Sequence, residues 1–432
     1  MKLFFSIAVR APFSFYQRFL LKYMFLSSRF PVLLLLILFS MRPSPSSAQD
    51  RQQNASSLFL LPQGNALSSL SGSGFGNIVQ LHPSDVATGN PAALTLLTQP
   101  SIAVSLQYGT TIDNAWIESV NWQYSRLNDV LPQSAGMVYP YKGWRLGLGY
   151  AQHYSANNQR GPIQVTTETS DLAYYSLEET RLHAVEPALA YTQEGILSPR
   201  DAWTIGIRAG LHLFTHDTQL DESYFKWNLH SPSWTIGTSY VWHTNDNRYV
   251  RAGLFYQDNV TLEGKASSFS KDVARIVLLP GSNSENPATV LIEPPAIQVA
   301  WPARLGGGVS GEPLPGLTLS AEVQRVFWQQ AEEQYHYKDQ TEFSVNAHYA
   351  FSKAISGTIA FHQAGRDYPQ DIRNPEVAFF GFDDAMQARY LALGGVVQWS
   401  NLQLDLAVAD SHLFSSEKNQ QTLLEIGLAV MF

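Results

Sequence analysis

The sequence predicts an all-β protein: a transmembrane antiparallel β-barrel of fourteen strands with an N-terminal plug segment inside it. Three observations support this prediction: the composition, a period of two along many segments, and short turns that alternate with long polar connections. Charged residues make up 15% of the 432-residue chain and aromatic residues 12%, yet the mean hydropathy is only −0.13. A soluble domain usually carries about 25% charged residues. A barrel strand shows only every second residue to lipid, which fits this mildly polar composition.

The N-terminus has the pattern of a secretory signal peptide. Its longest apolar run, PVLLLLILF at residues 31–39, is too short to cross a bilayer as a helix. Arg29 precedes the run, and small residues lead up to Ala48, so we expect cleavage after Ala48 and a signal peptide at 1–48. Translation starts at Met1 or, since the segment before the apolar run is long, at Met24.

Charge and apolar content restrict the possible partners of the exported chain. Six of the 28 Lys and Arg residues lie in 1–48 together with no acidic residue, so the mature chain carries 22 basic against 36 acidic residues. This balance speaks against a nucleic-acid partner. The mature sequence contains no run of 18 apolar residues, so we predict no transmembrane helix.

The C-terminal segment LLEIGLAVMF shows the clearest strand pattern. Its apolar side chains fall on one face at a period of two: Leu424, Ile426, Leu428, Val430 and Phe432. A terminal Phe is typical of the last strand of outer-membrane barrels. The same alternation recurs in segments near 203–213, 317–324, 343–349, 355–362 and 402–409. Their second faces hold Arg, Glu, Asp and His, which a wet barrel lumen accommodates better than a dry core.

The connections between these segments alternate in length. Short turns are expected at 141–143, 244–247, 312–316, 352–354 and 400–401. Long polar loops are expected at about 155–181, 214–232, 262–295, 329–340, 365–387 and 412–420. Short periplasmic turns and long outer loops are typical of barrels. We therefore expect the barrel to occupy 101–432.

The strand number depends on two segments, near 101–109 and 116–125. If they form one bent strand, the barrel has fourteen strands, which we prefer; if a further strand is present, it has sixteen. Residues 49–100 then lie outside the wall. Their apolar content favours a packed plug over a disordered periplasmic tail.

Within the plug segment, GNPAAL (89–94) has the pattern of a capped helix start, with Asn90 at the N-cap and Pro91 at N1. In its barrel context this stretch resembles the NPA-type hatch motif of the FadL-like family, outer-membrane transporters of long-chain fatty acids and other hydrophobic compounds. Further similarity covers most of 75–432, in the segments 234–267, 301–328, 348–371 and 391–410. The residues before Asn90 lack the Gly/Ala-rich run of the best-known members. The related PorV-like branch, which serves protein secretion, shares the motif and is not excluded.

The resemblance implies passive uptake in the outer membrane of a Gram-negative bacterium. Outer loops would capture a fatty acid, alkane or aromatic hydrocarbon, the lumen would bind it, and a gap in the wall would release it sideways. A lateral exit keeps an apolar ligand out of water. The expected partners are this ligand and outer-membrane lipids, and we expect a monomer. The alternative is a PorV-like secretion or structural partner that transports nothing; an open aqueous porin is disfavoured by the plug.

Candidate site residues follow from this hypothesis. The predicted ligand-binding residues are Phe75, Asn90, Pro91, Leu94, Leu97, Arg208 and Arg251, where the arginines suit a carboxylate. The predicted gating residues are Asn90, Pro91, Gly147 and Gly149, since glycine in a strand often marks a bend. Further charged or imidazole groups are expected to face the lumen: Glu322, Asp405, His212, His243, His348 and His362. For these, a solvated network that stiffens the barrel is the simpler interpretation.

No enzymatic function is predicted. The chain has no Cys, which excludes thiolate nucleophiles, disulfides and thiolate metal sites. It contains no G-x-S-x-G elbow and no H-E-x-x-H spacing. We therefore predict no catalytic residues, no cofactor and no metal ligands.

Overall fold

The computed structural model describes most of the chain from the plug onward. The described residues are 76–113, 130–166, 171–220, 223–269, 296–331, 339–364, 388–411, 413 and 419–432, except 245 and 247. The predicted signal peptide and plug residues 49–75 lie outside them. Phe75 is among these residues.

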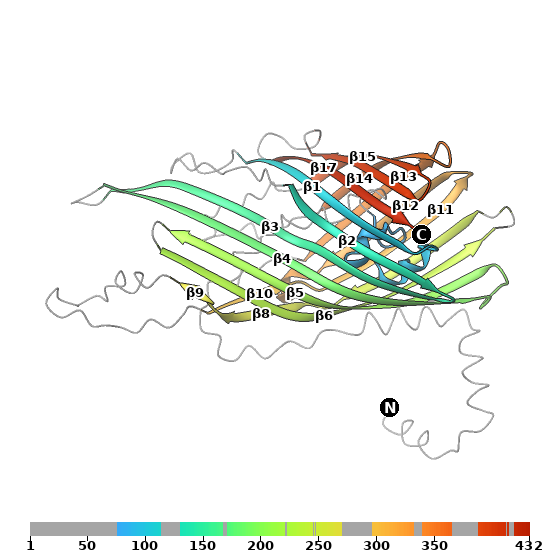
Figure 1. Cartoon of the computed structure of the whole chain (residues 1–432), viewed down its shortest axis with the longest axis horizontal. Coiled ribbons are helices and arrows are strands. Elements are labelled where there is room, and N and C mark those ends of the chain that lie inside the picture. The colour runs from blue at the N-terminus through green and yellow to red at the C-terminus, as the bar shows by residue number, and fades with distance from the viewer. Residues whose placement is uncertain are drawn as a thin grey trace, which may run out of the picture.

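Fourteen antiparallel strands form a closed barrel wall (Figure 1). The wall strands are β1 (Ser101–Asp113), β2 (Val130–Tyr141), β3 (Trp144–Thr166), β4 (Asp171–Glu194), β5 (Asp201–Leu220), β6 (Ser223–His243), β7 (Tyr249–Gln257), β11 (Arg304–Leu314), β12 (Leu317–Val326), β13 (Gln340–Ala350), β14 (Ile355–Ala364), β15 (Ala388–Trp399), β16 (Leu402–Asp410) and β17 (Asn419–Met431). β1 pairs with β17, which joins the two ends of the wall. The preferred count of fourteen is confirmed.

The strand count follows from how the first two segments divide. Residues 101–113 form β1, and 114–129, which include the predicted strand at 116–125, lie outside the described residues. β2 then begins at Val130. An even number of strands places both ends of the wall at the same rim, where the Phe432 N–H donates to Pro100 O at 2.8 Å.

The wall has an apolar outside and a polar inside. On β1, Ile102 and Leu106 are 50% and 41% exposed, while Ala103 and Ser105 between them are buried. The same alternation continues around the wall, for example on β17, where Leu424, Ile426 and Leu428 face outward and Glu425 inward. A continuous band of exposed aliphatic side chains is what a lipid-facing barrel surface requires.

Short turns join the strands at one rim, as predicted. β2 and β3 are linked through Lys142 and Gly143, β15 and β16 through Ser400 and Asn401. Lys142 and Ser400 adopt positive φ, as tight hairpin turns often demand.

At the opposite rim, two predicted loops are wrong. The regions 155–181 and 214–232 continue as strands, so that β3 with β4 and β5 with β6 form long hairpins with ladders almost to their tips. Beyond the membrane band both faces of a hairpin meet polar surroundings, so the alternation that reveals a strand disappears while backbone pairing persists. Figure 1 shows these hairpins extending far past the rest of the wall.

The plug lies inside the barrel near the short-turn rim, where Figure 1 shows it in blue. It contains two short 3-10 helices, η3 (Pro83–Ala87) and η4 (Pro91–Leu96). η3 lies against β1–β4 and β17, and η4 against β3–β7. A four-residue helix, α3 (Trp328–Ala331), follows β12. None of the helices in the described part of the chain is long and apolar enough to cross a bilayer.

A second, two-stranded sheet packs on the inner face of the wall. It pairs β8 (Val260–Lys265) with β10 (Ala296–Trp301), and we call it the inner sheet. A two-residue strand, β9 (Ser268–Phe269), pairs with β6. The predicted loop at 262–295 therefore begins within β8; residues 270–295 lie outside the described part.

Candidate functional site

The plug corner at Asn90 and Pro91 is fixed by the Asn90 side chain. Its Oδ1 accepts from Ala92 N at 3.0 Å, which caps η4, while Pro91 occupies the first helical position. Its Nδ2 donates to Ile78 O at 3.1 Å within the plug and to Thr238 O at 3.3 Å in β6. One buried side chain thus caps a helix, joins two plug segments and binds the wall.

Glycines in the wall let the plug approach the strand backbone. A Cβ on Gly237 would overlap Asn90 Oδ1, and one on Gly136 would overlap Pro83 O. A Cβ on Gly149 would lie 2.5 Å from Ala87 N. The plug therefore packs directly against the backbone of these wall glycines, and larger side chains at these positions would displace it.

Gly147 and Gly149 do not lie at a break in the wall. Gly147 pairs with Val138 of β2 and Ala188 of β4, and Gly149 pairs likewise on both sides. Their absent side chains make room for Val86 and Ala87 of the plug. These glycines therefore contact the plug and do not mark a bend where the wall opens.

Charged lumen residues hold the plug backbone. Arg208 is buried, donates to Val86 O at 3.2 Å and to Gly89 O, and its Nε lies 2.5 Å from Glu186 Oε2. Arg251 Nη1 donates to Val79 O at 2.8 Å. The two arginines predicted to bind a ligand carboxylate are thus engaged with plug carbonyl groups.

Glu322 of β12, which is separated from β7 by β11 alone, binds the same plug segment. Its carboxylate accepts from Asn77 N at 3.0 Å and from the amides of Ile78 and Val79, each at 2.9 Å. Three backbone donors on one buried carboxylate form a strong anchor, since charge-assisted hydrogen bonds are about twice as strong as neutral ones. Glu322 and Arg251 therefore both bind the backbone of Val79, and Glu322 also binds the two residues before it.

An ion pair joins the plug to β16. His82 Nε2 lies 2.9 Å from Asp405 Oδ2, and both side chains are buried. Burial lowers the pKa of His82, but the hydrogen bond and the charge of Asp405 outweigh it, helped by Asp85 and Glu425, so the pKa lies above its ordinary value of 6.5. The charged imidazole is favoured while the plug is docked.

The other predicted residues divide between packing and surface positions. Leu94 is fully buried and packs with Val86, Val138 and Ala188, and Leu97 lies against the same cluster. The imidazoles of His212 and His362 are buried in the lumen, His348 is half-buried beside Thr358, and His243 is exposed near the short-turn rim.

Successive side chains on the inner face of β5 contact different parts of the lumen. Arg208 binds the plug. His212 lies beyond Gly210 on the same face, and its ring centroid is 5.2 Å from that of His153 of β3. Phe214 follows and belongs to an apolar cluster. Moving away from the short-turn rim, the lumen therefore changes from the plug to a polar layer and then to an apolar layer.

The apolar cluster lies between the inner sheet and β4–β6. Its buried members are Leu182, Phe214, Trp227, Leu229, Val260, Leu262, Ala266, Ile297, Val299 and Trp301. The sequence does not reveal this cluster, because residues 262 and beyond have no long alternating pattern and are predicted to form a loop. These side chains are buried against one another, so the cluster is an apolar packed region within an otherwise polar lumen.

The wall between β2 and β3 has a discontinuity. Their ladder ends at the Ser134–Ala151 pair, beyond which the side-chain Nε2 of Gln133 donates to Gln152 O at 3.3 Å. Gln133 is an extra residue in β2 and His153 an extra residue in β3, so each strand carries a bulge there. Bulges terminate pairing and re-aim side chains, and two of them adjoin this end of the ladder.

Solved structures share this architecture. A Pseudomonas aeruginosa FadL homologue superimposes with a TM-score of 0.56 at 10% identity, covering 87% of this chain and 99% of its own. The Pseudomonas putida toluene transporter TodX gives 0.56 at 13% identity, covering 87% and 98%. The fold is FadL-like. The Ralstonia pickettii toluene transporter TbuX gives 0.55 at 15% identity, covering 85% and 98%.

None of these three descriptions names an enzyme. Comparison of the sequence with protein-family models gave no match. Comparison with curated proteins gave no match either. The FadL-like fold with its luminal plug was therefore recognisable from the hatch motif and strand order, while similarity over the whole sequence is weak.

Proposed function

We propose that the protein is an outer-membrane channel for hydrophobic compounds in a Gram-negative bacterium, exported by a signal peptide at 1–48 and acting as a monomer. The observation that carries the proposal is the apolar cluster of the inner sheet. It places ten buried aliphatic and aromatic side chains inside a barrel whose short-turn end holds a plug. The solutes transported by TodX and TbuX support a hydrophobic substrate.

The proposed route begins at the long hairpins, passes the inner sheet and leaves sideways near the end of the β2–β3 ladder. An apolar solute gains nothing from entering water, so an exit into the membrane is favoured. Among the described residues, the β2–β3 ladder has no pair beyond Ser134–Ala151, so an opening beyond this pair breaks none of its backbone pairs. The plug, seated against β2 and β3, borders this exit.

The engagement of Arg208 and Arg251 with plug carbonyls favours a neutral hydrocarbon over a fatty acid, whose carboxylate needs a guanidinium of its own. Uptake of labelled toluene and of a labelled long-chain fatty acid into proteoliposomes tests both solutes. Toluene should enter faster than through empty liposomes. No uptake of either solute would leave the PorV-like alternative, a secretion or structural partner.

A cross-link tests the lateral exit. The chain has no Cys, so a Gln133→Cys/Gln152→Cys variant should form one disulfide across the end of the β2–β3 ladder. Oxidation should reduce uptake and dithiothreitol should restore it. The matched control is Ala392→Cys/Ala409→Cys, a facing pair in the unbroken β15–β16 ladder. Equal uptake by oxidised and reduced Gln133→Cys/Gln152→Cys protein would contradict this exit.

A further inference from the structure

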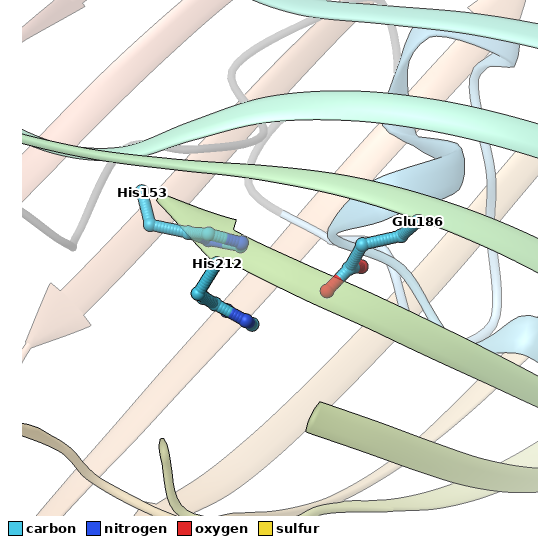
Figure 2. A group of neighbouring side chains, drawn as sticks. All are labelled: His153, Glu186 and His212. Carbon is cyan, nitrogen blue, oxygen red and sulfur yellow. The ribbon is translucent and has the colours of Figure 1, made fainter. Parts of the chain in front are cut away.

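A cluster of metal-ligating side chains lies in the polar layer between the plug and the apolar cluster. His153 of β3, Glu186 of β4 and His212 of β5 each place one ligand atom within 4.8 Å of the others. Figure 2 shows the carboxylate of Glu186 directed toward the two imidazole rings. The three residues come from three neighbouring strands, so no sequence spacing could have revealed them.

The lone pairs of this cluster are poorly satisfied. His153, Glu186 and His212 are 5%, 1% and 0% exposed. Within the described part of the chain, His153 Nε2 and both ring nitrogens of His212 have no hydrogen-bond partner. A buried polar group without a partner is costly, at about 1–3 kcal/mol each. A cation coordinated by all three side chains would satisfy one ring nitrogen of each histidine and the Glu186 carboxylate together.

Local backbone features open the space for these side chains. His153 is the extra residue of the β3 bulge, and a bulge re-aims the side chain that it carries. Gly210 faces Glu186, where a Cβ would lie 2.5 Å from Glu186 Oε1. His212 pairs with Ala184, which has a small side chain. Three separate positions are thus adapted to the same cluster.

We propose that His153, Glu186 and His212 form a binding site for a divalent transition-metal cation such as Zn²⁺. Two imidazoles and a carboxylate are a ligand set that Zn²⁺, Co²⁺ and Ni²⁺ accept. Ligand atoms bound to one Zn²⁺ at about 2.0–2.2 Å lie roughly 3–4 Å apart. Closure of this cluster on a cation therefore needs side-chain rotation and little backbone movement.

Arg208 orients the carboxylate of the site. It pairs with Glu186 Oε2 and at the same time donates to Val86 O and Gly89 O of the plug. Outer contacts of this kind fix first-shell ligands in metal sites. His153 adjoins the end of the β2–β3 ladder, so the cation would bind between the plug and the proposed exit.

Cobalt binding tests the site without reference to transport. The full-length protein in detergent is titrated with Co²⁺, and its visible absorption is followed before and after competition with Zn²⁺. We expect one Co²⁺ per chain, displaced by Zn²⁺. His212→Gln and His153→Gln should each weaken binding by at least about tenfold. The matched control, His362→Gln, removes a buried lumen imidazole on β14 and should leave binding unchanged.

Two results would overturn the proposal. One is the absence of saturable Co²⁺ binding by the wild-type protein. The other is equal affinity in the wild type and His212→Gln. Heat-modifiable migration on a gel shows that each variant retains the barrel. Because the readout is metal binding, it can fail while uptake persists, and uptake can fail while metal binding persists.

Discussion

The Asn90→Ala substitution should loosen the plug, because one side chain makes three hydrogen bonds that alanine cannot replace. Loss of an N-cap costs about 1 kcal/mol. The buried Ile78 carbonyl group, left without this donor, costs roughly 1–3 kcal/mol more. The total, about 2–4 kcal/mol, corresponds to about a 30-fold to 700-fold increase in the population of the undocked plug.

Hydrogen exchange by mass spectrometry on peptides that cover 83–97 measures this population, since exchange of protected amides follows local opening. Asn90→Ser retains a capping oxygen but has no amide donor, so its exchange should fall between the wild type and Asn90→Ala. A peptide from β14–β15 serves as an internal reference, because the described residues of those strands make no extensive contact with η3 or η4. If exchange in Asn90→Ala stayed within threefold of the wild type, the three bonds would not anchor the plug.

Three further predictions concern the plug and the lumen. Gly237→Ala should raise plug exchange by displacing Asn90, whereas Gly395→Ala, whose new Cβ would lie 4.0 Å from its nearest neighbour, should not; equal exchange would contradict the close seating. Plug protection, corrected for intrinsic exchange, should fall as pH rises. Because the pKa of docked His82 is raised, its ion pair with Asp405 stabilises the docked plug fully below pH 6.5, and this stabilisation is lost as pH rises through the raised pKa. His82→Gln should remove this pH dependence, and a slope unchanged in His82→Gln would assign it to other groups. Trp301→Ala should slow toluene uptake by removing one of the two tryptophan side chains of the apolar cluster. Trp399→Ala, at the exposed short-turn rim, should leave uptake unchanged, and similar slowing in both variants would argue against a role for the inner sheet.

The sequence predicted the fold where the membrane imposes a pattern. β17 alternates because lipid lies on one side and the lumen on the other, and the short turn through Lys142 and Gly143 was recognisable from its residues. The long hairpins were missed because outside the membrane band neither face has to be apolar. Their strand character depends on backbone pairing, which no single residue reports.

The candidate site could be predicted in part. The role of Asn90 as a helix cap followed from its neighbour Pro91. Arg208 and Arg251 were expected to face the lumen, but their carbonyl partners in the plug lie more than a hundred residues away in the chain. His153 was missed because an inserted residue reverses the alternation of a strand, and the face it occupies is known only once the register is.

The pairing of β1 with β17 imposes an order on how the protein forms. The wall can close only after the final strand has been synthesised, and the plug precedes the first strand in the chain. Yet the plug is bonded to β5, β7, β12 and β16, which are distributed around the wall. The plug must therefore be enclosed before or as the seam is sealed. It can then serve as an internal template that gathers distant strands during assembly.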